Sequence, residues 1–237
     1  MRRALVIFAA LAWLLGCGAM RAAAQSRTYD ELPAPDSANS AGGSGEQQVD
    51  GVAARIEDDI ITESEVRELA DFQVLVDGKA KPRMELIREL TDQWMVRNEA
   101  TATKYAPLAA ADVDRAYAEF MKQFPSPEDF ERRRAAAGLT EAAVRRMVAQ
   151  QLYLSRFIDY RFRPEAQVSD EQVEAYYHDE FAPQLKAAKK AVPPLEDVED
   201  TIREVLIQRA ISDRAAKWMD DTRERLKIDI VAPGSGS

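Results

Sequence analysis

The stretch VDGVAARIEDDIITESEVRE, residues 49–68, decides the fold because a strand, a turn and a helix start follow one another within it. Apolar side chains nearly alternate with other residues in its first half, at Val49, Val52, Ala54 and Ile56. This alternation predicts a short β-strand, and the acidic pair Asp58-Asp59 predicts the turn that follows it.

A capping box then predicts a helix that begins at Thr62. The Thr62 hydroxyl can accept a hydrogen bond from the Glu65 backbone amide, while the Glu65 carboxylate reaches back to the amide of Thr62. Ile61 and Val66 lie on either side of the box and form a hydrophobic staple. We expect this helix to end near Gly78, a residue typical of helix C-termini.

Start and stop signals divide most of the remaining chain into amphipathic helices. Ser126 and the Ser169–Gln172 pair are cap signals, whereas Gly138 and Pro183 are stop signals. The predicted helices cover residues 82–104, 110–123, 126–138, 140–164 and 169–183, each with apolar residues spaced by three or four.

A long helix and a final strand are predicted at the C-terminal end. After Pro194, apolar residues at helical spacing predict a helix to about Leu226, and the alternating stretch 227–231 predicts a strand. The natural partner of this strand is the first strand. The predicted fold class is therefore mainly α, with a small two-stranded sheet that joins the N- and C-terminal strands.

Residues 1–24 have the features of a signal peptide. Arg2 and Arg3 precede an apolar run over residues 4–15, which is shorter than the roughly 20 residues that a membrane-spanning helix needs. Two processing routes are open. Cleavage after Ala24 would release a soluble chain, whereas the lipobox-like Gly16-Cys17 would leave Cys17 as a lipidated N-terminus. Both routes place the protein outside the cytoplasm, in the periplasm, either free or tethered to a membrane.

Composition predicts a short list of domains. Residues 25–48 are rich in Ser, Gly, Ala and Pro and predict a disordered linker, residues 49–231 predict one folded domain, and residues 232–237 a disordered tail. Cys17 is the chain's one cysteine, so the core must form without a disulfide. The net charge of −9 becomes −12 without the three arginines of the signal peptide, which argues against a nucleic-acid partner.

The sequence predicts no catalytic residue, no cofactor and no metal site. Catalysis by a nucleophile or a general base needs a pair of suitably placed groups, and His178, the chain's one histidine, has no cysteine partner in the predicted domain. A lone histidine is also a poor metal site.

Three stretches together resemble the N-terminal domain family of SurA-like periplasmic chaperones, which are relatives of parvulin-type prolyl isomerases. The first is the opening stretch 49–68, and the second is FRPEAQVSDEQVEAYY at residues 162–177. The third, PLEDVEDTIREVLIQRAISDRAAKWMDDTRERLKIDIV at residues 194–231, resembles the helix and strand that fold back onto the N-terminal module. The family usually carries a parvulin domain between the last two stretches, but only fifteen residues separate Tyr177 from Pro193 here.

The resemblance implies a non-enzymatic, ATP-independent holdase whose partners are unfolded exported polypeptides, chiefly outer-membrane proteins. An alternative is an envelope scaffolding lipoprotein, anchored through Cys17, that binds a folded partner. In either case the chain meets the membrane only through that lipid anchor. The candidate client-binding side chains are aromatic or sulfur-containing, because such soft surfaces accept varied segments, and they are Trp94, Met95, Phe120, Phe124, Tyr176 and Tyr177.

Overall fold

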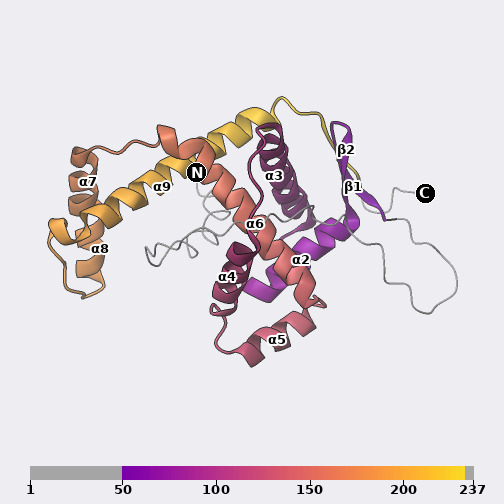
Figure 1. Ribbon diagram of the computed structural model, residues 1–237, viewed down its shortest axis with the longest axis horizontal. Helices are drawn as coiled ribbons and strands as arrows, with labels where there is room; N and C mark the ends of the chain where they lie inside the picture. The colour runs from indigo at the N-terminus through magenta and orange to yellow at the C-terminus, as the bar shows by residue number, and fades with distance from the viewer. Residues whose placement is uncertain (1–49, 233–237) are drawn as a thin grey trace. The chain divides into compact units, whose positions relative to one another are not determined.

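The computed structural model describes residues 50–232 (Figure 1). The predicted signal peptide, with Cys17, and the predicted linker lie outside the described residues, as does most of the predicted tail. The described chain divides into two compact units. Residues 50–153 and 226–232 form one, here named the sheet unit, and residues 154–225 form the other, named the helical unit.

The sheet unit contains a three-stranded antiparallel sheet with the strand order β2-β1-β3. Its strands are β1 (Val52–Ile56), β2 (Asp59–Thr62) and β3 (Ile228–Ile230). The predicted pairing of the first and last strands is confirmed, but the predicted number of strands was wrong. A hairpin loop of residues 57–58 turns the chain directly into β2, so Asp59 belongs to a strand rather than to the turn. Glu57 adopts φ 50°, a conformation that such tight hairpin loops require.

Five helices begin in the sheet unit, and the mainly α class is confirmed. They are α2 (Glu63–Asp77), α3 (Arg83–Ala102), α4 (Ala110–Met121), α5 (Pro127–Ala136) and α6 (Glu141–Phe162). The predicted capping box is present, with Thr62 as the N-cap and Glu65 as its partner. Gly78 follows α2 at φ 73°, a left-handed conformation that glycine adopts at little cost.

The helical unit holds the end of α6 and four further helical elements before α9. Those elements are η1 (Arg163–Glu165), α7 (Asp170–Tyr176), the π-helical turn η2 (Tyr177–Phe181) and α8 (Ala182–Ala187), and the unit closes with α9 (Leu195–Arg223). Pro183 does not end the helix, contrary to prediction. It lies in the first turn of α8, where the missing N–H of proline is tolerated.

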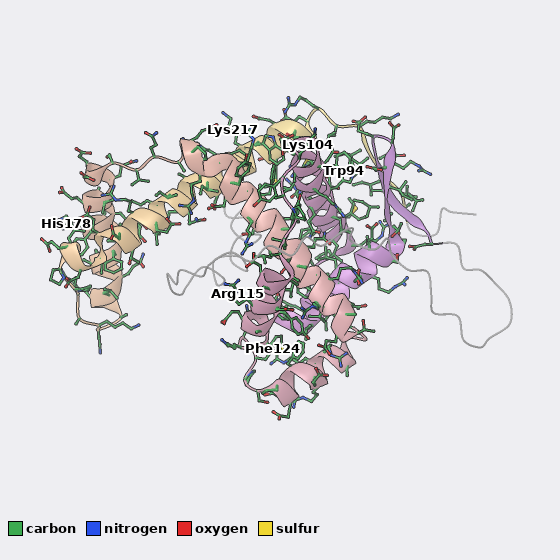
Figure 2. The ribbon with its side chains drawn as sticks, viewed as in Figure 1. Trp94, Lys104, Arg115, Phe124, His178 and Lys217 are labelled. Atoms are coloured by element: carbon green, nitrogen blue, oxygen red, sulfur yellow. The ribbon has the colours of Figure 1, made fainter. Side chains whose placement is uncertain are left out.

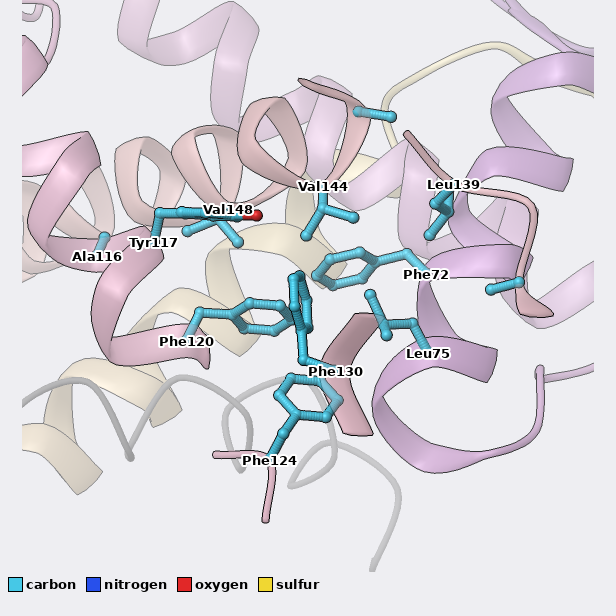
Figure 3. Close-up of a cluster of buried hydrophobic side chains, with 12 residues drawn as sticks. Phe72, Leu75, Ala116, Tyr117, Phe120, Phe124, Phe130, Leu139, Val144 and Val148 are labelled. Carbon is cyan, nitrogen blue, oxygen red and sulfur yellow. The ribbon is translucent and has the colours of Figure 1, made fainter. Parts of the chain in front are cut away.

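Two apolar clusters form the core of the sheet unit. The aromatic core lies between α2, α4, α5 and α6, and Figure 3 shows its central side chains Phe72, Phe120, Phe124 and Phe130. The second cluster lies under the sheet and includes Ile56, Ile61, Leu69 and Ile87, with Trp94, Leu226 and Ile228 packed at its border. The second cluster packs α3 against the sheet, and this arrangement positions the site described next.

Candidate functional site

An open hollow of about 320 Å³, here named the β2–α3 hollow, lies on the sheet unit beside strand β2. It is lined by Asp59 and Ile60 of β2, by Glu65 of α2, and by Trp94, Arg97, Asn98 and Thr101 of α3. The four α3 residues follow the spacing i, i+3, i+4 and i+7, so they share one face of the helix. The hollow therefore has a wall of helix on one side and a strand on the other.

Trp94 forms the apolar wall of the hollow (Figure 2). Its indole is half-buried and packs against the apolar cluster under the sheet. The indole Nε1–H donates a hydrogen bond to Asp59 Oδ2 at 2.8 Å, which links α3 to β2. Packing against this cluster and the hydrogen bond to Asp59 hold the indole ring in one orientation. A guest molecule therefore contacts a fixed aromatic surface.

Some charged and polar side chains of the hollow already form hydrogen bonds within the chain, and others do not. The Glu65 carboxylate already accepts hydrogen bonds from the Thr62 backbone N–H at 2.8 Å and from the Thr62 hydroxyl at 3.1 Å. Arg97 and Asn98 are exposed, and neither side chain forms a hydrogen bond or an ion pair within the described chain. Their hydrogen-bond donors are thus open to a guest, whereas the Asp59 and Glu65 carboxylates are occupied.

Three of the six candidate client-binding residues are buried in the sheet unit. Met95 is 2 % exposed, and Phe120 and Phe124 are 6 % and 8 % exposed. The two phenylalanines form part of the aromatic core, where their ring centroids lie 5.4 Å apart (Figure 3). In this structure they contribute to packing rather than to a surface, and Trp94 is the candidate that lines the hollow.

Tyr176 and Tyr177 belong to the helical unit, where they join the α7–η2 segment to the α9 region. The Arg209 guanidinium lies 4.7 Å from the Tyr176 ring centroid and donates to both oxygens of Glu180 at 2.9 Å. This hydrogen bonding lowers the pKa of Glu180. The Tyr177 hydroxyl donates to the Pro193 carbonyl oxygen at 2.7 Å. Both tyrosines are half-buried and have a positioning role within the unit.

Sequence reasoning missed the strand side of the hollow and its polar residues. Ile60, Arg97 and Asn98 were not candidates, because a search for aromatic and sulfur-containing side chains passes over them. One signal was available: the spacing of Trp94, Arg97, Asn98 and Thr101 places a tryptophan on a helix face that is otherwise polar. A tryptophan in such surroundings indicates a surface position more often than a core position.

No family model matches the chain, and no curated protein matches it. Within residues 50–232, no group of His, Cys, Asp or Glu side chains is arranged to hold a metal ion. A helix with the length and apolarity needed to cross a membrane is likewise missing from that part of the chain.

Proposed function

We propose that this protein is an ATP-independent chaperone, a holdase that binds unfolded exported polypeptides in the periplasm, outer-membrane proteins among them. The observation that carries the proposal is the antiparallel pairing of β3 with β1, in which Ile228 lies opposite Ile56 and Ile230 opposite Ala54. The resemblance to SurA-like chaperones requires the C-terminal helix and strand to return to the start of the module. The β1–β3 pairing supports that requirement.

Exposed apolar side chains supply the chemistry that a holdase needs. Ile60 and Ile230 are large exposed apolar residues of the sheet unit, as are Tyr160 and Val205 of the helical unit. Each can remove a small apolar area of a client from water, and several weak contacts together hold a client without a nucleotide-driven cycle. The acidic net charge supports solubility of the chain while a client is bound.

An aggregation assay tests this function. A denatured outer-membrane β-barrel protein is diluted into buffer with and without the protein, no nucleotide is added, and light scattering is followed. We expect scattering to fall as the protein is raised to molar excess. A folded acidic protein of similar size serves as the control for non-specific crowding. Unchanged scattering at molar excess of the protein would refute the holdase function.

The scaffolding lipoprotein remains a second candidate because Gly16-Cys17 directly follows the apolar run of the signal peptide. Membrane fractionation of the wild type and of the Cys17→Ala variant separates the two. A wild type in the membrane fraction and a variant in the soluble fraction would establish the lipid tether. If both proteins are soluble, the anchored scaffold is excluded.

A further inference from the structure

We infer that the outer edge of β2 and the β2–α3 hollow together bind an extended segment of unfolded polypeptide, which adds to the sheet as a strand beside Ile60 and places an apolar side chain against Trp94. This inference rests on the proposed holdase function and names the form in which a client is held. Three observations support it: the register of the sheet, the residues that line the hollow, and the Arg97 and Asn98 side chains, which form no hydrogen bond within the described chain.

The hydrogen bonds between β1 and its C-terminal partner show which way each residue of β1 faces. The Val231 N–H donates to the Ala53 carbonyl oxygen at 3.0 Å, and the Glu57 N–H donates to the Lys227 carbonyl oxygen at 3.1 Å. The backbone groups of successive strand residues point to opposite sides of the strand. From Ala53 to Glu57 the odd-numbered residues therefore face β3, and the even-numbered residues face β2. A register shift between Val52 and Ala54 reverses this order before Ala53, where the Glu63 N–H donates to the Gly51 carbonyl oxygen.

This alternation leaves one residue of β2 open on the outer edge. The facing pairs are Ala54 with Ile61 and Ile56 with Asp59, so these residues use their backbone groups between the two strands. Ile60 lies between Asp59 and Ile61, and its N–H and C=O point away from β1. Its backbone thus offers one donor and one acceptor to a further strand.

The position of the added strand is restricted by the neighbouring residue on the same edge. Thr62 also faces outward, but the Glu65 carboxylate already holds its N–H at 2.8 Å. A guest strand can therefore exchange two backbone hydrogen bonds with Ile60 and cannot extend along α2. Such a short pairing gives weak binding, which suits a chaperone that must release its client.

The hollow beside Ile60 fits a side chain of the same guest strand. The Ile60 side chain is 52 % exposed, because the buried Ile61 takes the opposite face of β2. The Trp94 indole lies on the Ile61 face of β2, where it packs against the apolar cluster and donates to Asp59. It therefore offers apolar surface to the guest residue next to the one that pairs with Ile60. Arg97 and Asn98 place open donors beside it, and backbone carbonyl oxygens of the guest are suitable acceptors.

These features select an extended unfolded segment as the occupant. The Ile60 edge needs a partner that carries both a backbone N–H and a backbone C=O, and a folded protein has already paired most of its own backbone groups. The Arg97 side chain makes no hydrogen bond or ion pair within the described chain, so its guanidinium is open to the carbonyl oxygens of a guest. An unfolded segment supplies all three requirements at once: backbone groups, carbonyl oxygens and an apolar side chain.

Peptide binding to Trp94 tests the inference directly. In the full chain, Trp13→Phe and Trp218→Phe leave Trp94 as the sole tryptophan. The probe is the acetylated and amidated peptide TVTFTVT, and Trp94 fluorescence is followed as its concentration rises. We expect a saturable change in emission. The absence of saturable binding would overturn the inference.

Methylated copies of the peptide separate strand addition from simple apolar contact. Alternate backbone nitrogens are methylated in two versions, one for each edge of the peptide. Methylation of the edge that faces Ile60 removes its hydrogen bond, so we expect one version to bind about tenfold more weakly and the other to bind like the parent peptide. Equal binding of the parent and both methylated versions would contradict strand addition.

Two matched variants connect the site to the holdase activity. Ile60→Lys introduces a charge on the edge, whereas Met84→Lys changes a comparably exposed apolar residue of the same unit that does not line the hollow. Circular dichroism checks that both variants fold. We expect Ile60→Lys to weaken peptide binding about tenfold and to reduce suppression of aggregation, and Met84→Lys to leave both unchanged.

The two proposals fail in different ways. If the wild type suppresses aggregation and Ile60→Lys behaves like Met84→Lys in both assays, the strand-addition site is refuted while the holdase function stands. If the wild type binds the peptide at Ile60 but never suppresses aggregation, the holdase function is refuted and a peptide-binding site remains.

Discussion

Phe130 shows how a single aromatic residue can hold a helix that has little other apolar surface. It is the one buried residue of α5, a helix that is otherwise rich in charged side chains. Its ring centroid lies 5.2 Å from that of Phe124 and 6.2 Å from those of Tyr117 and Phe120 (Figure 3). These edge-to-face contacts add to the burial of the ring, so α5 is held mainly through one side chain.

We therefore expect Phe130→Ala to lower the free energy of unfolding of the sheet unit by about 3–5 kcal/mol, as is typical for the removal of a buried phenylalanine. Urea unfolding followed by circular dichroism measures this change. Met84→Ala is the control, because its exposed side chain should contribute less than about 0.5 kcal/mol. An effect of Phe130→Ala as small as that of the control would show that α5 is held by other contacts.

The residues of the candidate site could be predicted only in part, because their exposure depends on contacts between residues far apart in the sequence. Helical spacing identifies which residues share a face, but Met95 and Trp94 are adjacent in the sequence and lie on different faces of α3. Met95 is buried, whereas Trp94 is half-buried beside the hollow. Their exposure depends on β2, which packs near α3 through contacts far apart in the sequence. No local pattern around residue 94 contains that information.

At the scale of elements, the helical unit is held by an ion-pair network around Arg163. Its guanidinium donates to both carboxylate oxygens of Glu204 on α9, at 2.7 and 3.1 Å, and to Asp159 on α6 at 2.8–3.1 Å. Gln208 donates to both carboxylates and completes the network. The hydrogen bonds from Arg163 lower the pKa of Glu204 below its ordinary 4.5. These charge-assisted hydrogen bonds link α6 to α9 within the unit.

This network predicts acid sensitivity of the helical unit. A carboxylate whose pKa is lower in the folded state stabilises the fold above the unfolded value near 4.5, and this contribution is lost as the pH falls through the folded value. We expect Glu204→Gln to lower the melting temperature at pH 7, with a difference from the wild type that shrinks towards pH 3. Thermal unfolding by circular dichroism at several pH values measures both effects.

Glu224→Gln is the matched control for this measurement. Glu224 follows α9 and forms no side-chain ion pair with a described residue. Its substitution should leave the melting temperature nearly unchanged at every pH. A Glu204→Gln deficit that stays constant from pH 7 to pH 3 would contradict the assigned role of the Glu204 charge.

The elements that the sequence predicted best are those with local chemical signals. The capping boxes at Thr62 and Ser169 are both present as predicted, since each involves residues only three positions apart. Strand β2 was missed because it ends at Thr62, which is also the N-cap of α2. The residues before Thr62 were therefore interpreted as the approach to a helix and not as a strand. The continuation of the helix past Pro183 was missed because the π-helical turn that precedes it has no clear sequence signal.

At the scale of the whole molecule, the C-terminal strand completes a unit whose other part lies far earlier in the sequence. The Lys227 N–H donates to Glu57 Oε1, 170 residues before it, at 2.7 Å. Leu226 and Ile228 also pack against the apolar cluster under the sheet. A chain that ends at Arg225 should lose at least about 3 kcal/mol of the stability of the sheet unit, because it removes these apolar contacts and one strand.

Urea unfolding of this truncated chain with Trp13→Phe and Trp218→Phe, followed by Trp94 fluorescence and compared with the full chain carrying the same two substitutions, measures the loss. A chain that ends at Ala232 is the control, since it keeps β3 and its apolar contacts, and it should unfold like the wild type. Equal midpoints for the chain ending at Arg225 and the wild type would show that β3 is dispensable for the sheet unit.

The pairing of β1 with β3 also governs the order in which the protein can fold as it is made. The ribosome releases β1 before β3, so the central position of β1 in the sheet cannot be filled on both sides until all the helices from α2 to α9 and then β3 have emerged. During that interval the β3-facing backbone of β1 is an open edge. A newborn chain of this protein therefore passes through the same exposed state as the polypeptides that we propose it protects.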